Sequence, residues 1–108
     1  MDRIEIFETV INAIPLPAVI IGGSKRILAM NDASVRLLAL NAKGAHYTSV
    51  LRQPAATAAI DRSLSDGQAR DIRVALRDEG RDASWRLDIR PLACPQSSGL
   101  MVVFQDIS

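Results

Sequence analysis

Apolar residues follow a helical spacing over the first fourteen positions of the chain. Ile4, Phe7, Ile11 and Ile14 recur at intervals of three and four residues, so they share one face of a helix. Pro15 ends this helix, because its ring cannot continue the ladder of backbone hydrogen bonds. The pattern predicts an amphipathic helix over residues 2–14 whose apolar stripe needs a surface to cover.

Five further segments have the patterns of β-strands. Residues 18–21 and 100–104 are apolar at every position, which predicts neighbouring central strands that are buried on both faces. Residues 26–30 predict another strand, which follows the first one after a Gly-Gly-Ser turn. Residues 72–76 and 85–89 alternate between apolar and charged side chains, so they predict strands near one edge. Together the segments predict an antiparallel-rich sheet of five strands.

The charges on the two alternating strands favour one register between them. With Leu76 opposite Trp85, the apolar side chains match and opposite charges face each other on the solvent side. A slip of one residue would lose both matches. The expected ion pairs across the strands are Arg73 with Asp88 and Asp71 with Arg90.

Caps and breakers predict helices in the middle of the chain. Asn31 can accept a hydrogen bond from the first turn of a helix that ends near residue 40. A short helical turn is expected over residues 47–51. Pro54 suits the first turn of a further helix that runs to about Leu64.

Two of these features together resemble a known family. Asn31 opens the helix after the second strand, and the last strand runs into Gln105-Asp106-Ile107-Ser108. This combination resembles the PAS sensor domain, with Ser108 in the position where the family has Thr. The resemblance covers essentially the whole chain. The segment Leu51-Arg52-Gln53-Pro54, with Asp66-Gly67 after the Ala-rich helix, is more narrowly similar to PAS domains of phosphate-regulon sensor histidine kinases.

The resemblance implies a fold and a role. The fold is an α+β PAS fold, with helices on one face of the five-stranded sheet and the N-terminal amphipathic helix on the other. Residues 1–14 would form a cap and dimerisation helix, and residues 15–108 the PAS core. The role would be regulatory and non-catalytic, in signal relay and dimerisation within a bacterial-type two-component sensor histidine kinase. The alternative is a small-molecule-binding PAS module of another signalling protein, such as a transcription regulator or a cyclic-di-GMP enzyme.

Composition narrows the class of partner. The chain has 108 residues and a formal net charge of +1, with basic and acidic residues interspersed, so we expect no nucleic-acid partner. A single cysteine excludes an internal disulfide and favours a reducing compartment. No apolar run approaches the roughly 20 residues that span a bilayer, so this segment should make no direct membrane contact. We expect a cytoplasmic segment of a membrane-anchored protein that forms a homodimer and precedes a C-terminal kinase or other output domain.

Few residues could bind a cofactor or a metal ion, or act in catalysis. His46 lies in a predicted loop and not on the long helix, where a haem ligand of a PAS domain would be expected. Cys94 precedes Pro95 in a predicted turn and not on a pocket helix, where a flavin-adduct cysteine would be expected. One His and one Cys cannot complete a four-ligand zinc site. We therefore expect no cofactor, no metal and no catalytic residue.

The remaining candidate residues belong to three regulatory sites. The first is a dimer interface on the N-terminal helix, formed by Ile4, Phe7, Ile11 and Ile14. The second is the exit of the chain, where Asp106, Ile107 and Ser108 would act as a signal-output hinge. The third is a ligand pocket between the Ala-rich helix and the sheet, lined by Leu38, Ala55, Ala59, Val74, Trp85 and Leu87.

Overall fold

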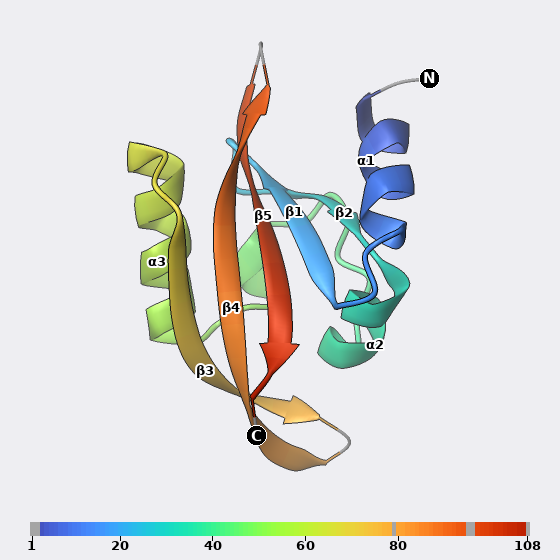
Figure 1. The fold of residues 1–108 in the computed structure, drawn as a ribbon, viewed down its shortest axis with the longest axis vertical. Coiled ribbons are helices and arrows are strands. Elements are labelled where there is room, and N and C mark those ends of the chain that lie inside the picture. Colours follow the sequence, from blue (N-terminus) through green and yellow to red (C-terminus); the bar gives the residue numbers. More distant parts are fainter. Residues whose placement is uncertain (1–2, 79, 95–96, 108) are drawn as a thin grey trace.

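The computed structural model describes residues 3–78, 80–94 and 97–107, so Ser108 lies outside the described residues. Three α-helices, one short 3₁₀-helix and five strands follow one another in these segments (Figure 1). Their bounds are α1 (Arg3–Asn12), β1 (Ala18–Gly22), β2 (Ile27–Met30), α2 (Asp32–Leu38), η1 (Tyr47–Ser49), α3 (Pro54–Asp66), β3 (Arg70–Asp78), β4 (Arg81–Cys94) and β5 (Ser97–Asp106).

The five strands form one antiparallel sheet in the order β2-β1-β5-β4-β3. The two strands that are apolar throughout, β1 and β5, pair with each other, as predicted. All five residues of β1 are buried, which explains why the strand carries no polar side chain. The alternating strands β4 and β3 follow toward one edge. The predicted fold class and strand arrangement are confirmed.

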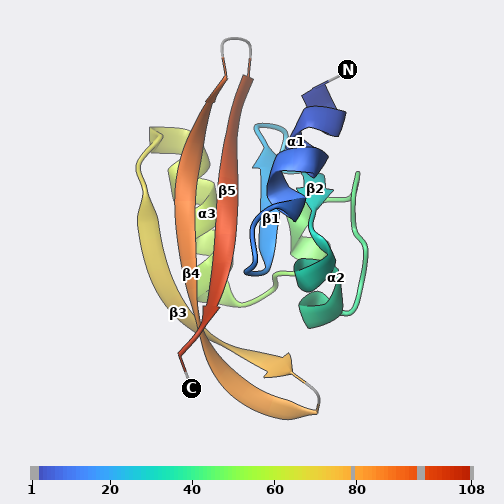
Figure 2. The same cartoon turned by 45° about the vertical axis from the view of Figure 1, so that its right-hand side comes forward.

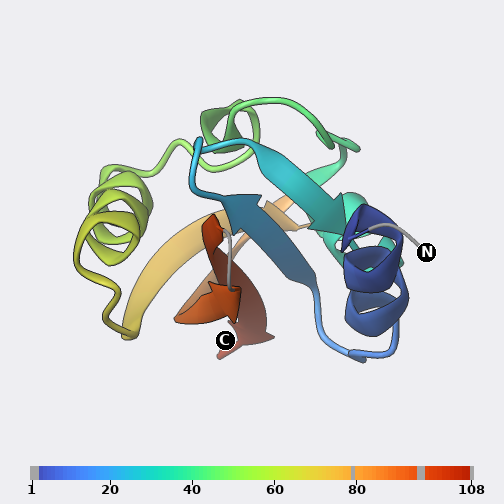
Figure 3. The same ribbon diagram turned by 90° about the horizontal axis from the view of Figure 1, so that it is seen from above.

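Alternate residues of the sheet belong to two separate cores. On one face, α3 and η1 pack against Val19, Val102 and Leu87 together with the rest of the larger core. On the other face, α1 packs against a smaller group that includes Ala18 and Ile20. Figure 3 shows α1 and α3 on different sides of the strands. The N-terminal helix therefore covers the face of the sheet that the other helices leave open, as expected.

Helix ends follow from local chemistry. Pro54 stands in the first turn of α3, where its missing N–H has no intrahelical partner to lose. Gly67 ends α3 with a φ of +70°, a left-handed conformation that glycine adopts at little cost. The helix after Asn31 is shorter than predicted, because Ala39 takes a φ of 60° and stops α2 at Leu38. No helix among the described residues is long and apolar enough to cross a bilayer.

The predicted register between β3 and β4 is wrong by two residues. Val74 lies opposite Trp85, and Asp71 lies opposite Asp88. A shift of two residues keeps every side chain on its predicted face, so the hydrophobic pattern could not exclude it. The turn sets the register instead. The pairing of β3 with β4 continues to Asp78 and Arg81, and Gly80 between them has a φ of +79°.

The expected ion pairs across β3 and β4 are consequently wrong too. Arg73 lies opposite Arg86 and does not pair with Asp88. Asp88 instead binds arginines of its own strand, with Oδ1 2.9 Å from Nε of Arg90 and Oδ2 4.0 Å from Nη2 of Arg86. The matching of opposite charges did not predict the register, because the carboxylate of Asp88 interacts with Arg86 and Arg90 of its own strand and needs no partner on β3.

Candidate functional site

Asn31 forms the junction between the first helix and the sheet. Its side chain is 2% exposed, and its Oδ1 accepts hydrogen bonds of 3.0 Å from the backbone N–H groups of Ser34 and Ala18. The first bond caps α2, which is the role expected from the sequence. The second bond fixes the start of β1. One carbonyl oxygen therefore aligns a helix and a central strand.

The amide nitrogen of Asn31 reaches back to the N-terminal segment. Nδ2 donates to the backbone carbonyls of Ile11 at 3.1 Å, Ile14 at 3.2 Å and Leu16 at 2.8 Å. These carbonyls belong to the end of α1 and the segment that leads to β1. Sequence reasoning missed this half of the site, because a side chain that contacts residues fifteen to twenty positions earlier leaves no local pattern.

The predicted dimer residues lie largely on the chain's own sheet. Ile11 is fully buried, and Phe7 and Ile14 are half-buried in the smaller core. The side chain of Ile4 lies outside the described residues. The structure instead exposes a second apolar flank of α1, formed by Ile6 and Val10 with exposed fractions of 46% and 53%.

The predicted pocket residues divide into three groups. Ala59, Val74 and Leu87 are buried in the larger core, and Leu38 packs against it from α2. Ala55 is exposed and cannot line a pocket between α3 and the sheet, because the buried stripe of α3 passes through Ala56. Trp85 is also buried in the larger core, but it lines a groove in a different place.

This groove lies between α2 and the end of the β3–β4 hairpin and has a volume of about 620 Å³. Figure 2 shows α2 beside that end of the hairpin. Trp85 forms part of its wall, and Arg36 and Arg77 contribute positive charge from α2 and β3. The sequence analysis did not identify these two arginines, because they come from elements that only the folded sheet brings together. We call this feature the Trp85 groove.

The predicted signal-output segment leaves the sheet next to Trp85. Asp106 is the last residue of β5, lies directly opposite Trp85 on β4, and is exposed. The backbone N–H of Ile107 donates a hydrogen bond of 3.0 Å to the carbonyl of Ser84, so the exit is still tied to β4. Ile107 is 39% exposed, and Ser108 lies outside the described residues.

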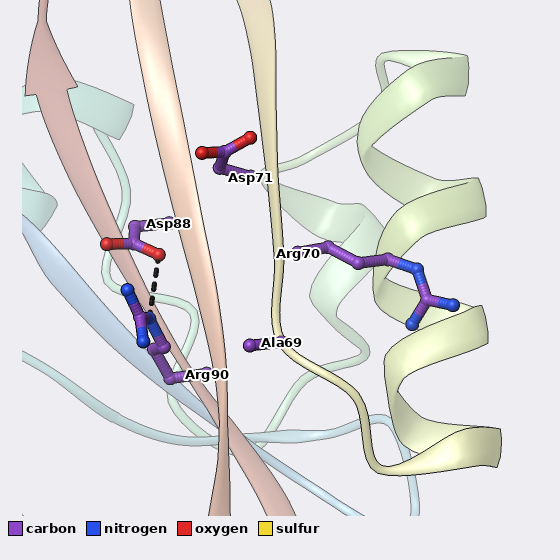
Figure 4. A pocket seen from close by; sticks show the side chains of 5 residues that line it. All are labelled: Ala69, Arg70, Asp71, Asp88 and Arg90. Carbon is purple, nitrogen blue, oxygen red and sulfur yellow. Dashed lines mark hydrogen bonds and ion pairs between the residues drawn. The ribbon is translucent and has the colours of Figure 1, made fainter.

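A polar pocket on the side of β3 and β4 that faces away from α3 contains charged residues of these two strands (Figure 4). It has a volume of about 280 Å³, and Asp71, Asp88 and Arg90 lie along it (Figure 4). Arg70 lines the same pocket, but its guanidinium group points toward α3, where Nη1 lies 2.8 Å from Asp66 Oδ1. The hydrogen bond to Asp88 raises the pKa of Arg90, and the bond to Arg70 lowers the pKa of Asp66. These contacts are structural ion pairs.

His46 and Tyr47 form a second polar cluster, which holds η1 against α3. Nδ1 of His46 accepts from the backbone N–H of Thr48 at 3.3 Å and caps η1, and the ring stacks on Tyr47 with 5.0 Å between centroids. The Tyr47 hydroxyl donates to Asp61 Oδ1 at 2.7 Å. Burial, and then this contact, raise the pKa of Tyr47. Within the described segments no group of His, Cys, Asp and Glu side chains could hold a metal ion.

Cys94 differs from its expected place in a turn. Cys94 is the last residue of β4, and its backbone pairs with that of Ser97 at the start of β5. Its side chain lies outside the described residues.

Comparisons with known proteins bear on the fold. No protein-family model matches the chain, and no curated protein matches it either. The PAS domain of BvgS from Bordetella pertussis matches with a TM-score of 0.76 at 18% sequence identity, over 100% of this chain and 88% of that one. A LOV protein from Rhodobacter sphaeroides matches with a TM-score of 0.77 at 12% identity, over 96% of this chain and 67% of that one.

A third solved structure, a PAS domain from a two-component sensor histidine kinase, matches with a TM-score of 0.62 at 13% identity over 94% of each chain. The match to the BvgS domain covers the whole chain, so it includes the five-stranded sheet in the order β2-β1-β5-β4-β3 and the helices that pack against it. The chain therefore has the PAS fold, which it shares with PAS domains of sensor kinases and with LOV proteins.

Proposed function

We propose that the chain is a regulatory, non-catalytic PAS module of a two-component sensor histidine kinase. The observation that carries the proposal is the match of the entire chain to the PAS domain of BvgS, supported by the match to a PAS domain of a two-component sensor kinase. The module would act in the cytoplasm as a segment of a membrane-anchored protein. Its partners would be a second copy of the chain and a C-terminal kinase domain.

A continuous set of contacts supports a role in signal relay. Asn31 binds the carbonyls of Ile11 and Ile14 at the end of α1, and it also binds the N–H of Ala18 in β1. β1 pairs along its full length with β5, and Asp106 at the end of β5 precedes the exit. A displacement of α1 would therefore bias the position of the chain where it leaves the sheet.

The same helix supports a dimer. Ile6 and Val10 are one helical turn apart on an exposed flank of α1, next to the residues that cover the sheet. Two copies that bury these flanks against each other would remove apolar surface that the monomer leaves in water. Because Ile11 is already buried in the monomer, the interface would use the flank of α1 and the half-buried Phe7 and Ile14.

The narrower likeness to phosphate-regulon kinases rests on residues that the fold itself explains. Leu51 is fully buried, Pro54 begins α3, and Gly67 ends it. The fold favours each of these three residues at its position, whichever stimulus the domain responds to. We therefore keep the proposal at the level of a sensor histidine kinase.

Neighbouring residues of α1 offer a matched test of the dimer. Val10→Glu places a charge on the exposed apolar flank, whereas Thr9→Glu places it about 100° away around the helix. Sedimentation equilibrium should show a dimer for the unaltered chain and for Thr9→Glu, with dissociation at least about tenfold easier for Val10→Glu. A chain that stays monomeric at millimolar concentration, or equal dissociation of both variants, would contradict the dimer.

The alternative function, a small-molecule-binding module of another signalling protein, is favoured by one specific observation. That observation is the Trp85 groove, which opens beside the exit of the chain.

A further inference from the structure

The walls of the Trp85 groove differ in chemistry. Pro17, Leu37 and Ala39 give one wall an apolar surface, formed by the start of β1 and the end of α2. Arg36 and Arg77 add two guanidinium groups from different elements. A volume of about 620 Å³ is in the range of small-molecule sites. The groove therefore has room for a small organic molecule and combines apolar contact with positive charge.

The two arginines are available to a ligand. Neither Arg36 nor Arg77 makes an ion pair or a side-chain hydrogen bond with any described residue. By contrast, Arg70 forms an ion pair with Asp66 of α3, and Arg90 forms one with Asp88 of its own strand. Guanidinium groups bind carboxylates through pairs of parallel hydrogen bonds, which are stronger than bonds between neutral groups.

Trp85 adds a second, independent observation at the groove. Its side chain is 6% exposed, yet its Nε1–H has no acceptor within the described part of the chain. Buried polar groups are nearly always paired, and an unpaired one costs stability. Nε1 is itself enclosed, and Trp85 lines the groove, so we infer that the indole must turn for an acceptor in the groove to reach Nε1.

We propose that the Trp85 groove binds a small organic carboxylate with an apolar body. Arg36 and Arg77 would hold the carboxylate, and the apolar wall would contact the apolar part of the ligand. The indole of Trp85 would rotate when the ligand binds. Trp85 belongs to the larger core and Leu37 packs against it, whereas Arg36, Ala39 and Arg77 line the groove outside that core. The site deepens the alternative function above, and it does not depend on the dimer or on a kinase partner.

The position of the groove gives it a route to the exit. Trp85 pairs directly with Asp106, and its neighbour Ser84 accepts the hydrogen bond of the Ile107 N–H. Any rotation of the indole therefore occurs next to the last residues of β5. Binding of a ligand in the groove would therefore change the position of the chain where it leaves the sheet.

The single tryptophan makes a direct experiment available, because its indole N–H gives one isolated NMR signal. The unaltered domain would be titrated with cyclohexylacetate, which carries one carboxylate on an apolar ring, and with cyclohexylacetamide, which has the same shape without the charge. Glutarate would serve as an anion without an apolar ring. We expect cyclohexylacetate to shift the Trp85 signal with saturation below about 10 mM, and to bind at least about tenfold more tightly than the other two.

Arginine variants identify the binding groups. Arg36→Gln and Arg77→Gln should each weaken cyclohexylacetate binding by about fivefold to tenfold. Arg73→Gln is the matched control, since Arg73 is an exposed arginine of the same strand as Arg77 and lies outside the groove. The proposal would be overturned by equal binding of the amide and the carboxylate, by an equal effect of Arg73→Gln, or by no shift of the Trp85 signal at that concentration. Amide spectra of each variant would show that it is folded.

Discussion

Asn31 donates a hydrogen bond of 3.1 Å from Nδ2 to the backbone carbonyl of Ile11, twenty residues earlier in the chain. Both groups are buried, so the bond forms away from water. It joins the amphipathic helix α1, which packs on one face of the sheet, to the helix cap at the end of β2. The two ends of the amide thus have different tasks: the oxygen orders β1 and α2, and the nitrogen orders α1.

Replacement of Asn31 with Asp separates these tasks. The carboxylate retains an acceptor for Ser34 and Ala18, but it removes the donor and faces backbone carbonyls with a negative charge. We expect Asn31→Asp to lower the free energy of unfolding by about 3 kcal/mol, because an ionised group is left buried beside unpaired carbonyls. Urea denaturation at neutral pH measures the loss.

Asn41→Asp is the control for that substitution. Asn41 is exposed, and its Oδ1 accepts a single local bond from the backbone N–H of Lys43, which an Asp can also accept. The control should change stability by less than about 0.5 kcal/mol. Similar losses in the two variants would mean that the bonds from Nδ2 contribute nothing measurable.

Tyr47 should make the stability of the domain depend on alkaline pH. Burial and the hydrogen bond to Asp61 raise its pKa above the ordinary value of about 10. The folded state then keeps its proton where the unfolded state loses it. The resulting stabilisation is complete below pH of about 10 and falls as the pH rises above it.

The chain has one tyrosine, so its ionisation can be followed alone by ultraviolet absorbance. The titration of the folded domain should begin well above that of free tyrosine. Urea midpoints should fall more steeply from about pH 10 to 11 for the unaltered chain than for Tyr47→Phe. Asp61→Asn should keep the effect of burial and lose the contribution of the carboxylate. Titration at the ordinary pKa would show that Tyr47 is accessible to water in solution.

The register of β3 and β4 can be tested by cross-linking. Because Asp71 and Asp88 lie directly opposite each other, cysteines at these two positions should form a disulfide under mild oxidation. Cysteines in place of Arg73 and Asp88 lie diagonally and should form it far more slowly. Both pairs would be made in a Cys94→Ser background, and mass spectrometry would identify the bond. Preferential cross-linking of the second pair would restore the register expected from charge.

The fold was predictable from the sequence wherever burial alone determined the pattern. The continuous apolar runs of β1 and β5 predicted their central pairing, and Asn31 predicted the start of α2. The register of β3 and β4 was not predictable in the same way, because a shift of two residues preserves the faces. The conformation of Gly80 carried that information, but a glycine in a turn fits several loop lengths.

The candidate sites were predictable only in part, for a related reason. Trp85 was expected to line a pocket between the Ala-rich helix and the sheet, because an alternating strand places it on the core face, whereas it lines the groove beside α2. Arg36 and Arg77 were missed, since nothing local distinguishes an arginine beside a groove from one in open solvent. Ala55 was included through the composition of α3, whereas the phase of the helix buries Ala56. Side chains that meet through tertiary contacts leave the weakest trace in the sequence.

The exit of β5 gives the prediction that bears on signalling. Asp106 shares the core-side row of β5 with Phe104, yet it is exposed at the strand end and lies opposite Trp85. The next residue, Ile107, is still bound to Ser84 of β4. Removal of the Asp106 side chain should therefore alter how the chain leaves the sheet without disturbing the core. We expect Asp106→Ala to change the free energy of unfolding by less than about 1 kcal/mol.

In the sensor histidine kinase that we propose as the full protein, Asp106→Ala should shift the ratio of kinase to phosphatase activity severalfold at unchanged protein abundance. Gln105→Ala is the matched control, because Gln105 is the adjacent exposed residue and points to the other face of the strand. Phosphate transfer to and from the response regulator would be measured for both variants and for the unaltered protein. A ratio that is the same in all three would remove Asp106 from the output mechanism, since a residue that merely ends a strand has no reason to affect that ratio once the domain is folded.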